Sequence, residues 1–207
     1  MVKNLHLEIL VEELSAEAAL KNLLPKILGD NVSFKIIPHQ GKKDLLKKLP
    51  QKLKAYSKWI DNQIKLVVLI DLDKEDCKKL KSELNRIAKN SGLKIKTTIG
   101  ELTSNFQILN RIAIEELESW FLGDKNALIK TYPKLKPKIF NKSKFRNPDA
   151  IKDPWEELER ILQKNGYYSQ GLEKIQNARL ISSNMDINNN ASKSFNCFQQ
   201  SLKLLIS

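Results

Sequence analysis

KLVVLIDLD, at residues 65–73, is an unbroken aliphatic run that ends in two aspartates. A short, continuously apolar and β-branched segment of this kind is typical of a strand that is buried on both faces. Such strands occur in parallel sheets whose two faces are covered by helices. We therefore predict that residues 65–70 form the central strand of an α/β fold.

The segments on either side alternate between strand and helix patterns. Further strands are predicted over 5–11, 32–37 and 93–99, and helices over 15–28, 42–59 and 75–90. Pro50 is expected to split the second of these helices, because proline removes a backbone donor. This alternation predicts a mostly parallel sheet with right-handed crossovers.

The pattern changes after residue 100. Residues 107–114 can add one more strand, and helices are predicted over 115–122, 154–164, 168–183 and 194–206. The expected architecture is an α/β core at 1–106, and a C-terminal strand and helical subdomain at 107–207 that caps it.

Several classes of protein are excluded by the sequence. No segment approaches the ~20 apolar residues that span a bilayer, and the N-terminus lacks a signal-peptide pattern. The two cysteines, Cys77 and Cys197, form no paired motif. We expect a cytoplasmic protein with reduced thiols and no membrane partner. No GxxxxGK[ST] loop and no zinc-ligand spacing is present, so the chain has no P-loop ATP site of its own.

The chain is basic, with 36 Lys and Arg against 24 Asp and Glu and a net charge of +12. Two stretches concentrate this charge: residues 42–58 contain seven lysines and one acid, and residues 130–146 contain seven basic residues and no acid. Such a field attracts phosphate backbones, although a solvated lysine face has the same composition. Aromatic residues within the second stretch (Tyr132, Phe140 and Phe145) favour nucleic acid, because bases stack on exposed rings. The candidate nucleic-acid-binding residues are Lys42, Lys43, Lys47, Lys142, Lys144 and Arg146.

Carboxylates follow two of the predicted strands. Glu12 and Glu13 come after the first strand, and Asp71 and Asp73 come after the central one. If these strands are neighbours, their carboxylates converge at the functional edge of the sheet. A hard divalent cation would relieve the resulting repulsion, so we predict a Mg²⁺ or Mn²⁺ site. The alternative is that Asp71 caps the following helix.

Three further residues are candidates. His39 lies in a loop after the second strand, where it could act in catalysis or simply be a hydrogen-bonded surface residue. Glu115 and Glu118 flank an apolar stripe and could face the same acidic pocket, whereas Trp120 and Phe121 are expected to pack the cap onto the sheet.

The strand-end motifs VEE (11–13) and DLD (71–73), in this strand order, resemble the Toprim core of topoisomerases, primases and OLD-type nucleases. Nearly the whole chain resembles an uncharacterised bacterial family with a Toprim-like core, often encoded beside AAA- or ABC-type ATPases in phage-defence regions. Six stretches carry that resemblance: VEELS (11–15), PHQGKKDL (38–45), DLDKEDCKKLK (71–81), RIAIEELESWFLGD (111–124), KFRNPDAI (144–151) and SKSF (192–195).

The resemblance implies roles for individual residues. Glu12 would be a metal ligand or general acid/base, and Asp71 and Asp73 would hold the metal. This chain departs from the pattern, since Glu13 stands where Toprim cores usually have glycine. Ala16 stands where OLD-type nucleases have a glutamate, with Glu17 one position later. Either Glu13 and Glu17 act as ligands after a one-residue shift, or a metal site is lost.

Three functions remain open from the sequence. The first is a Mg²⁺-dependent nuclease subunit that cleaves DNA or RNA with a separate ATPase partner in antiviral defence. The second is a non-catalytic regulatory subunit with a degenerate site, which binds nucleic acid or the ATPase. The third is a receiver-like phosphoacceptor, which the absence of a convincing lysine after a fifth strand disfavours. A second copy of the chain is a further candidate partner.

Overall fold

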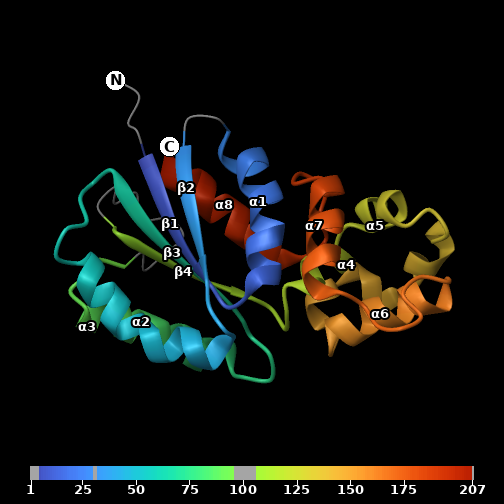
Figure 1. The fold of residues 1–207 in the computed structure, drawn as a ribbon, viewed down its shortest axis with the longest axis horizontal. Helices are drawn as coiled ribbons and strands as arrows, with labels where there is room; N and C mark the ends of the chain where they lie inside the picture. The colour runs from blue at the N-terminus through green and yellow to red at the C-terminus, as the bar shows by residue number, and fades with distance from the viewer. Residues whose placement is uncertain (1–4, 30–31, 96–105, 207) are drawn as a thin grey trace.

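A computed structural model describes residues 5–29, 32–95 and 106–206 (Figure 1). Within these residues, one sheet of four parallel strands has the order β2-β1-β3-β4. The strands are β1 (Leu5–Val11), β2 (Val32–Pro38), β3 (Ile64–Asp71) and β4 (Ile108–Ala113). Residues 65–70 of β3 are all buried, so the prediction of a central strand and an α/β fold is confirmed.

Helices cover both faces of the sheet (Figure 1). On one face lie α2 (Lys42–Tyr56) and α3 (Cys77–Asn90), and on the other lie α1 (Leu14–Leu28) and α8 (Lys193–Ile206). Successive side chains of a strand point to opposite faces. Leu66, Val68 and Ile70 therefore pack in the core beneath α2 and α3, whereas Val67 and Leu69 pack in the core beneath α1 and α8.

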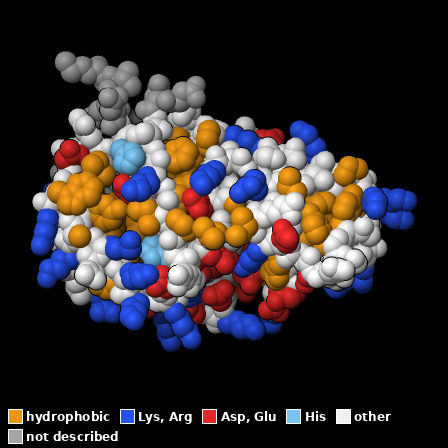
Figure 2. Space-filling model, viewed as in Figure 1, with side chains coloured by type: hydrophobic (Ala, Val, Ile, Leu, Met, Phe, Trp, Pro, Cys, Tyr) orange, Lys and Arg blue, Asp and Glu red, His pale blue; other side chains and the backbone are white. Residues whose placement is uncertain are grey.

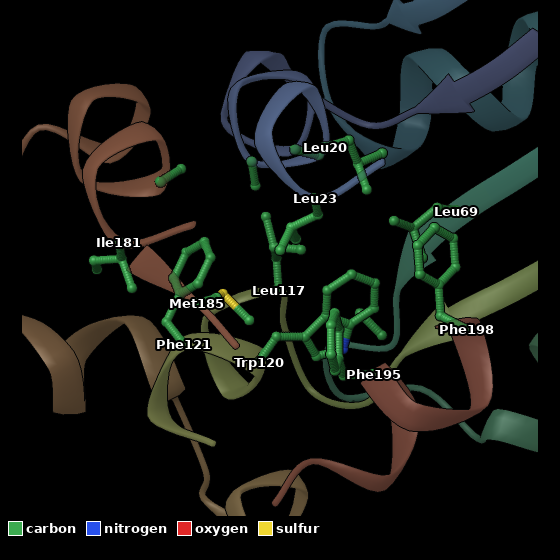
Figure 3. Close-up of a cluster of buried hydrophobic side chains, with 14 of the residues drawn as sticks. Leu20, Leu23, Leu69, Leu117, Trp120, Phe121, Ile181, Met185, Phe195 and Phe198 are labelled. Atoms are coloured by element: carbon green, nitrogen blue, oxygen red, sulfur yellow. The ribbon is translucent and has the colours of Figure 1, made fainter. Parts of the chain in front are cut away.

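The C-terminal half adds helices beside α1. They are α4 (Glu118–Leu122), α5 (Lys125–Thr131), α6 (Pro154–Lys164) and α7 (Lys174–Asn184), with short 3₁₀ segments at Pro137–Asn141, Ser143–Arg146 and Pro148–Ala150. Helix α7 lies along α1. Trp120 is fully buried against Phe195 and Phe198 of α8, which joins α4 to the sheet (Figure 3). Trp120 and its neighbour Phe121 thus pack the cap, as predicted.

Asp149 links two of the sequence motifs that lie far apart in the chain. Its Oδ1 accepts a hydrogen bond from Ser192 Oγ (2.6 Å), and its Oδ2 accepts one from the Ser194 amide (2.7 Å). The first amides of a helix lack intrahelical partners, so this carboxylate satisfies the start of α8. The motifs around residues 144–151 and 192–195 therefore have a structural role, because these hydrogen bonds join them.

One prediction about the helices is wrong. Pro50 does not split the helix over 42–59, because α2 is continuous from Lys42 to Tyr56. Three fully buried leucines, Leu45, Leu49 and Leu53, lie on one face of α2 and anchor it to the sheet on both sides of the proline. This packing outweighs the single hydrogen bond that Pro50 cannot donate.

Other predicted boundaries shift. The strand expected over 107–114 is present as β4, which spans Ile108–Ala113, and α7 begins at Lys174 rather than near 168. Of the strand predicted over 93–99, the structure describes a single parallel bridge between Ile95 and Ile108, and residues 96–99 lie outside the described ranges. The division of the chain at residue 106 stays a prediction. Among the described residues, no helix is long and apolar enough to cross a membrane.

The aromatic residues of the basic stretch do not form an exposed stacking surface. Tyr132, Phe140 and Phe145 are buried and belong to the larger hydrophobic core. Their hydrophobic area is worth more inside the core than on the surface. The prediction that these rings offer exposed stacking surfaces is therefore wrong.

Candidate functional site

The strand-end carboxylates meet because β1 and β3 are neighbours. Val11 is paired with Leu69, so Glu12 lies level with Ile70. The Glu12 Oε1 accepts a hydrogen bond from the backbone amide of Asp71 at 2.7 Å. Asp71 does not cap the following helix, because Asp76 does so by accepting from the Lys79 amide. The register therefore brings the ends of the two strands together at one edge of the sheet.

Strand β4 brings a third acidic segment to the same edge. Its last residue, Ala113, is paired with Asp71, and the Asp73 amide donates to the Glu115 carbonyl at 2.7 Å. Asp73 and Glu115 both have positive φ, 51° and 57°. Non-glycine residues adopt this conformation at a cost of about 1 kcal/mol or more, so the surrounding structure must hold both turns in place.

These strand ends gather acidic side chains in one place, which we call the acidic cluster. Figure 2 shows acidic side chains in the lower middle of the view, between the sheet and helices α6 and α7. Two lysines enter this acidic cluster from opposite sides. Lys42, the first residue of α2, places its Nζ 2.6 Å from Asp73 Oδ2, 3.0 Å from Glu75 Oε1 and 3.1 Å from the Leu72 carbonyl. Lys42 thus binds the DLD turn.

Lys174, the first residue of α7, is the second of these lysines. Its Nζ lies 2.7 Å from Glu13 Oε1 and 5.6 Å from the centre of the Trp155 ring. The Lys174 ammonium group is also attracted by the carboxyls of Glu118 and Asp71. Although burial opposes it, the attraction of these two groups and of Glu13 raises the pKa of Lys174 above its ordinary range. Lys174 therefore joins the C-terminal half to the carboxyl edge of the sheet.

The carboxylates are incompletely neutralised by these two lysines. Burial raises the pKa of Glu12 to about 7, opposed by the Asp71 amide and by Lys42. Burial and the nearby Glu12 and Glu118 carboxylates raise the pKa of Asp71 well above its ordinary range. Burial likewise raises the pKa of Glu118 to about 7. Burial is the main cause at all three carboxyls, and a group of strongly shifted pKa values is typical of a functional site.

Glu118 carries the most direct sign of a missing partner. Its side chain is 1% exposed, and its Oε2 has no hydrogen-bond partner among the described residues. A buried oxygen without a partner is unfavourable, so in native proteins it usually has a water, an ion or a ligand beside it. Carboxylate oxygens are also the donors that Mg²⁺ and Mn²⁺ prefer. The donor chemistry and charge of the cluster therefore fit a divalent cation.

The geometry is not that of a formed metal centre. In the described part of the chain, no three His, Cys, Asp or Glu side chains are arranged so that they could hold a metal ion. Asp73 and Glu13 are instead engaged by Lys42 and Lys174. A cation could use these carboxylates only by exchanging with the lysine ammonium groups.

Other predicted site residues lie elsewhere. Glu17 pairs with Lys21 on α1 at 2.7 Å. His39 is 8% exposed, its Nδ1 bonds to the Val11 carbonyl at 2.8 Å, and burial lowers its pKa. His39 is therefore a buried residue and not a surface one.

The basic candidates are also dispersed. Lys43 and Lys47 are exposed on α2, where only their neighbour Lys42 reaches the carboxylates. Lys144 pairs with Glu157 at 2.7 Å, whereas Lys142 and Arg146 are exposed. Whether these residues bind nucleic acid stays a prediction.

Two participants were missed by the sequence analysis. Lys174 lies 161 residues after Glu13, with no motif that connects the two. Trp155 donates its amide to Glu116 Oε2 at 3.0 Å and lies beneath Lys174. The packing of α7 on α1 brings Lys174 to the carboxylates, whereas Trp155 comes from α6, so no local pattern could have revealed either residue.

Comparison with known proteins identifies a family. A family model described as a domain of unknown function, DUF4276, matches residues 11–203. No curated protein and no solved structure gives a significant match. The match covers the whole acidic cluster and both of its lysines. Its description names neither a Toprim fold nor an ATPase, so both stay predictions.

Proposed function

The chain belongs to DUF4276, a family of unknown function, and we propose from its carboxylate cluster that it hydrolyses nucleic-acid phosphodiesters with Mg²⁺ or Mn²⁺. The hydrogen bond from the Asp71 amide to Glu12 is the observation that carries this proposal. It sets carboxylates from adjacent parallel strands together at the edge of the sheet where α/β proteins bind their ligands. The unpartnered oxygen of buried Glu118 supports the same conclusion.

In this proposal Asp71, Asp73 and Glu12 would hold the cation after Asp73 exchanges the Lys42 ammonium group for it, because the described carboxylates are not yet arranged as a metal centre. A bound divalent cation would polarise the phosphate and lower the pKa of its water. Glu12 Oε1 is occupied by the Asp71 amide, so its Oε2 is the atom left to accept or donate a proton. Lys42 lies within reach of Asp73, where an ammonium group can also bind a substrate phosphate.

The partner and the setting are part of the proposal. The chain has no P-loop, so control by nucleotide hydrolysis would come from a separate AAA- or ABC-type ATPase. Its Toprim-like arrangement, with Glu12 after the first strand and the Asp71–Asp73 pair after the third, supports a role as the nuclease subunit of an antiviral defence system.

A second function is favoured by a specific observation. Lys42 and Lys174 already neutralise Asp73 and Glu13, and Glu17 is bound to Lys21. Ion pairs of this kind would also stabilise a degenerate site that no longer binds metal. In that case the chain would be a non-catalytic subunit that binds nucleic acid or the ATPase.

Cleavage assays separate these functions. Wild-type protein, alone and with any AAA- or ABC-type ATPase encoded beside it, is incubated with single- and double-stranded DNA and RNA in Mg²⁺, in Mn²⁺ and in EDTA. The nuclease proposal predicts cleavage that EDTA and the Asp71→Asn/Asp73→Asn variant abolish. Glu83→Gln is the matched control, because Glu83 is exposed on α3, away from the cluster. Binding without cleavage under every condition would favour the non-catalytic function.

A further inference from the structure

A pocket of about 590 Å³ lies in the C-terminal half, formed by residues that the carboxylate site does not use. Its walls come from the start of α5, the 3₁₀ segments at 137–146 and the loop before α8. A volume of this size accommodates a small organic ligand. The pocket therefore has room for more than a single ion.

Some of the polar groups around the pocket serve the fold. Asp124 is buried, and its carboxylate accepts from the amides of Ala127 (2.9 Å) and Asp186 (2.8 Å). The Asn190 side chain bonds to the Trp120 carbonyl and the Ser192 amide. A Cβ atom on Gly123 would lie 2.2 Å from Asn190 Oδ1, so this close approach requires glycine. The loop that bounds the pocket is thus held firmly in place.

Other polar side chains around the pocket have no such role. Within the described ranges, five of them are exposed and make no side-chain hydrogen bond or ion pair: Lys125, Asn126, Asn141, Arg146 and Asn189. Three are amides, which offer both a donor and an acceptor, and two are cations. The buried rings of Phe140 and Phe145 give the same pocket an apolar floor.

We infer that this pocket binds a nucleotide unit, either as a free nucleotide or as an unpaired residue of a nucleic-acid strand. The two cations suit a phosphate group, which Arg146 can contact through two parallel hydrogen bonds. The amides match the mixed donors and acceptors of a base edge, and the apolar floor suits the base ring. The lining also contains one carboxylate, Asp124, whose two oxygens accept hydrogen bonds from backbone amides, so the cations outnumber it by two to one. The inference does not depend on the chemistry of the carboxylate cluster.

Titrations test this site on the full chain without added metal. The probes are AMP, UMP, inorganic phosphate and a short fluorescein-labelled single-stranded oligonucleotide. The variants are Arg146→Ala and Asn141→Ala, both at exposed side chains without partners, and folding is checked by thermal melting. Lys138→Ala is the control, because Lys138 is exposed in the same basic stretch but does not line the pocket.

We expect each pocket variant to weaken binding about tenfold, and Lys138→Ala by less than about twofold. Binding of AMP or UMP identifies a free-nucleotide site, and binding of the oligonucleotide alone identifies a strand site. The inference is overturned if no probe binds, or if phosphate binds as tightly as AMP. It is also overturned if Lys138→Ala weakens binding as much as Arg146→Ala, since the attraction would then be diffuse. The nuclease proposal is tested by cleavage with added metal and this inference by binding without it, so the two can fail separately.

Discussion

Glu12 Oε1 accepts a hydrogen bond from the amide of Asp71 at 2.7 Å, although 59 positions separate the two residues. The bond exists because β1 and β3 are adjacent and parallel, which sets the ends of both strands at one level. It also places two carboxylates side by side in a partly buried site, where burial raises the pKa of Glu12 to about 7 and that of Asp71 well above its ordinary range. The two raised pKa values therefore mark this edge of the sheet as the candidate functional site.

Lys174→Met should destabilise the protein in the absence of divalent cations. The variant removes the ion pair with Glu13 and the charge that opposes the buried Glu118 and Asp71 carboxylates. We expect a loss of about 1 to 2 kcal/mol at pH 7.5 by urea unfolding, part of which Mg²⁺ restores. The matched control Lys21→Met breaks an exposed pair with Glu17 and should cost less than about 0.5 kcal/mol. Equal losses in the two variants would contradict a special role for Lys174.

Glu118→Gln should change how stability depends on pH. Burial raises the folded-state pKa of Glu118 from its ordinary value of 4.5 to about 7, so the folded protein binds this proton more tightly than the unfolded chain does. Stability should therefore fall as pH rises from 4.5 to about 7, by at most about 3 kcal/mol from this group.

Unfolding measured across this pH range without metal checks the prediction. In Glu118→Gln the slope should be smaller but not absent, because the pKa values of Glu12 and Asp71 are also raised. Glu83→Gln, at an exposed site, should keep the wild-type slope. A Glu118→Gln slope that matches wild type would show that folding does not raise the pKa of Glu118.

Asp149→Ala should weaken the attachment of α8 to the rest of the protein. The variant removes the acceptors of Ser192 Oγ and of the Ser194 amide. We expect a loss of about 1 to 3 kcal/mol in urea unfolding, and a smaller loss in Asp149→Asn, which keeps one acceptor. If both variants unfold like wild type, the hydrogen bonds of Asp149 contribute nothing to stability.

Pro50→Ala should stabilise the protein, because alanine restores the amide that α2 lacks at this position. Pro50 is exposed, so the substitution disturbs no core packing. A gain of about 1 kcal/mol or more, seen as a higher thermal midpoint, is expected. A lower midpoint would mean that the restriction that proline imposes on the unfolded chain outweighs the missing hydrogen bond.

The sequence was sufficient for the sheet because its strongest signals are local. The aliphatic run at 65–70 and the acids that follow it identified β3 and the edge where the carboxylates meet. The sequence did not predict the features that depend on tertiary packing. Buried leucines keep α2 continuous through Pro50, and the core takes up Phe140 and Phe145, which could equally have been exposed.

The acidic cluster was predictable only in part, because some of its contacts also depend on tertiary packing. Glu12, Asp71 and Asp73 follow strands, so the fold class implies their convergence. Lys174 reaches Glu13 only because α7 packs along α1, and Glu17 is removed from the cluster by a pair with Lys21 one helical turn away. Charge compensation between distant segments leaves no pattern along the chain.

Calorimetric titration of Mg²⁺ and Mn²⁺ tests the central claim most directly. Wild-type protein is compared with Asp71→Asn/Asp73→Asn, with Glu83→Gln as the control for charge and with thermal melting as the control for folding. The metal-site proposal predicts saturable binding in wild type and Glu83→Gln, and none in the folded double variant. Absence of saturable binding in folded wild-type protein, or equal binding in the double variant, would contradict it.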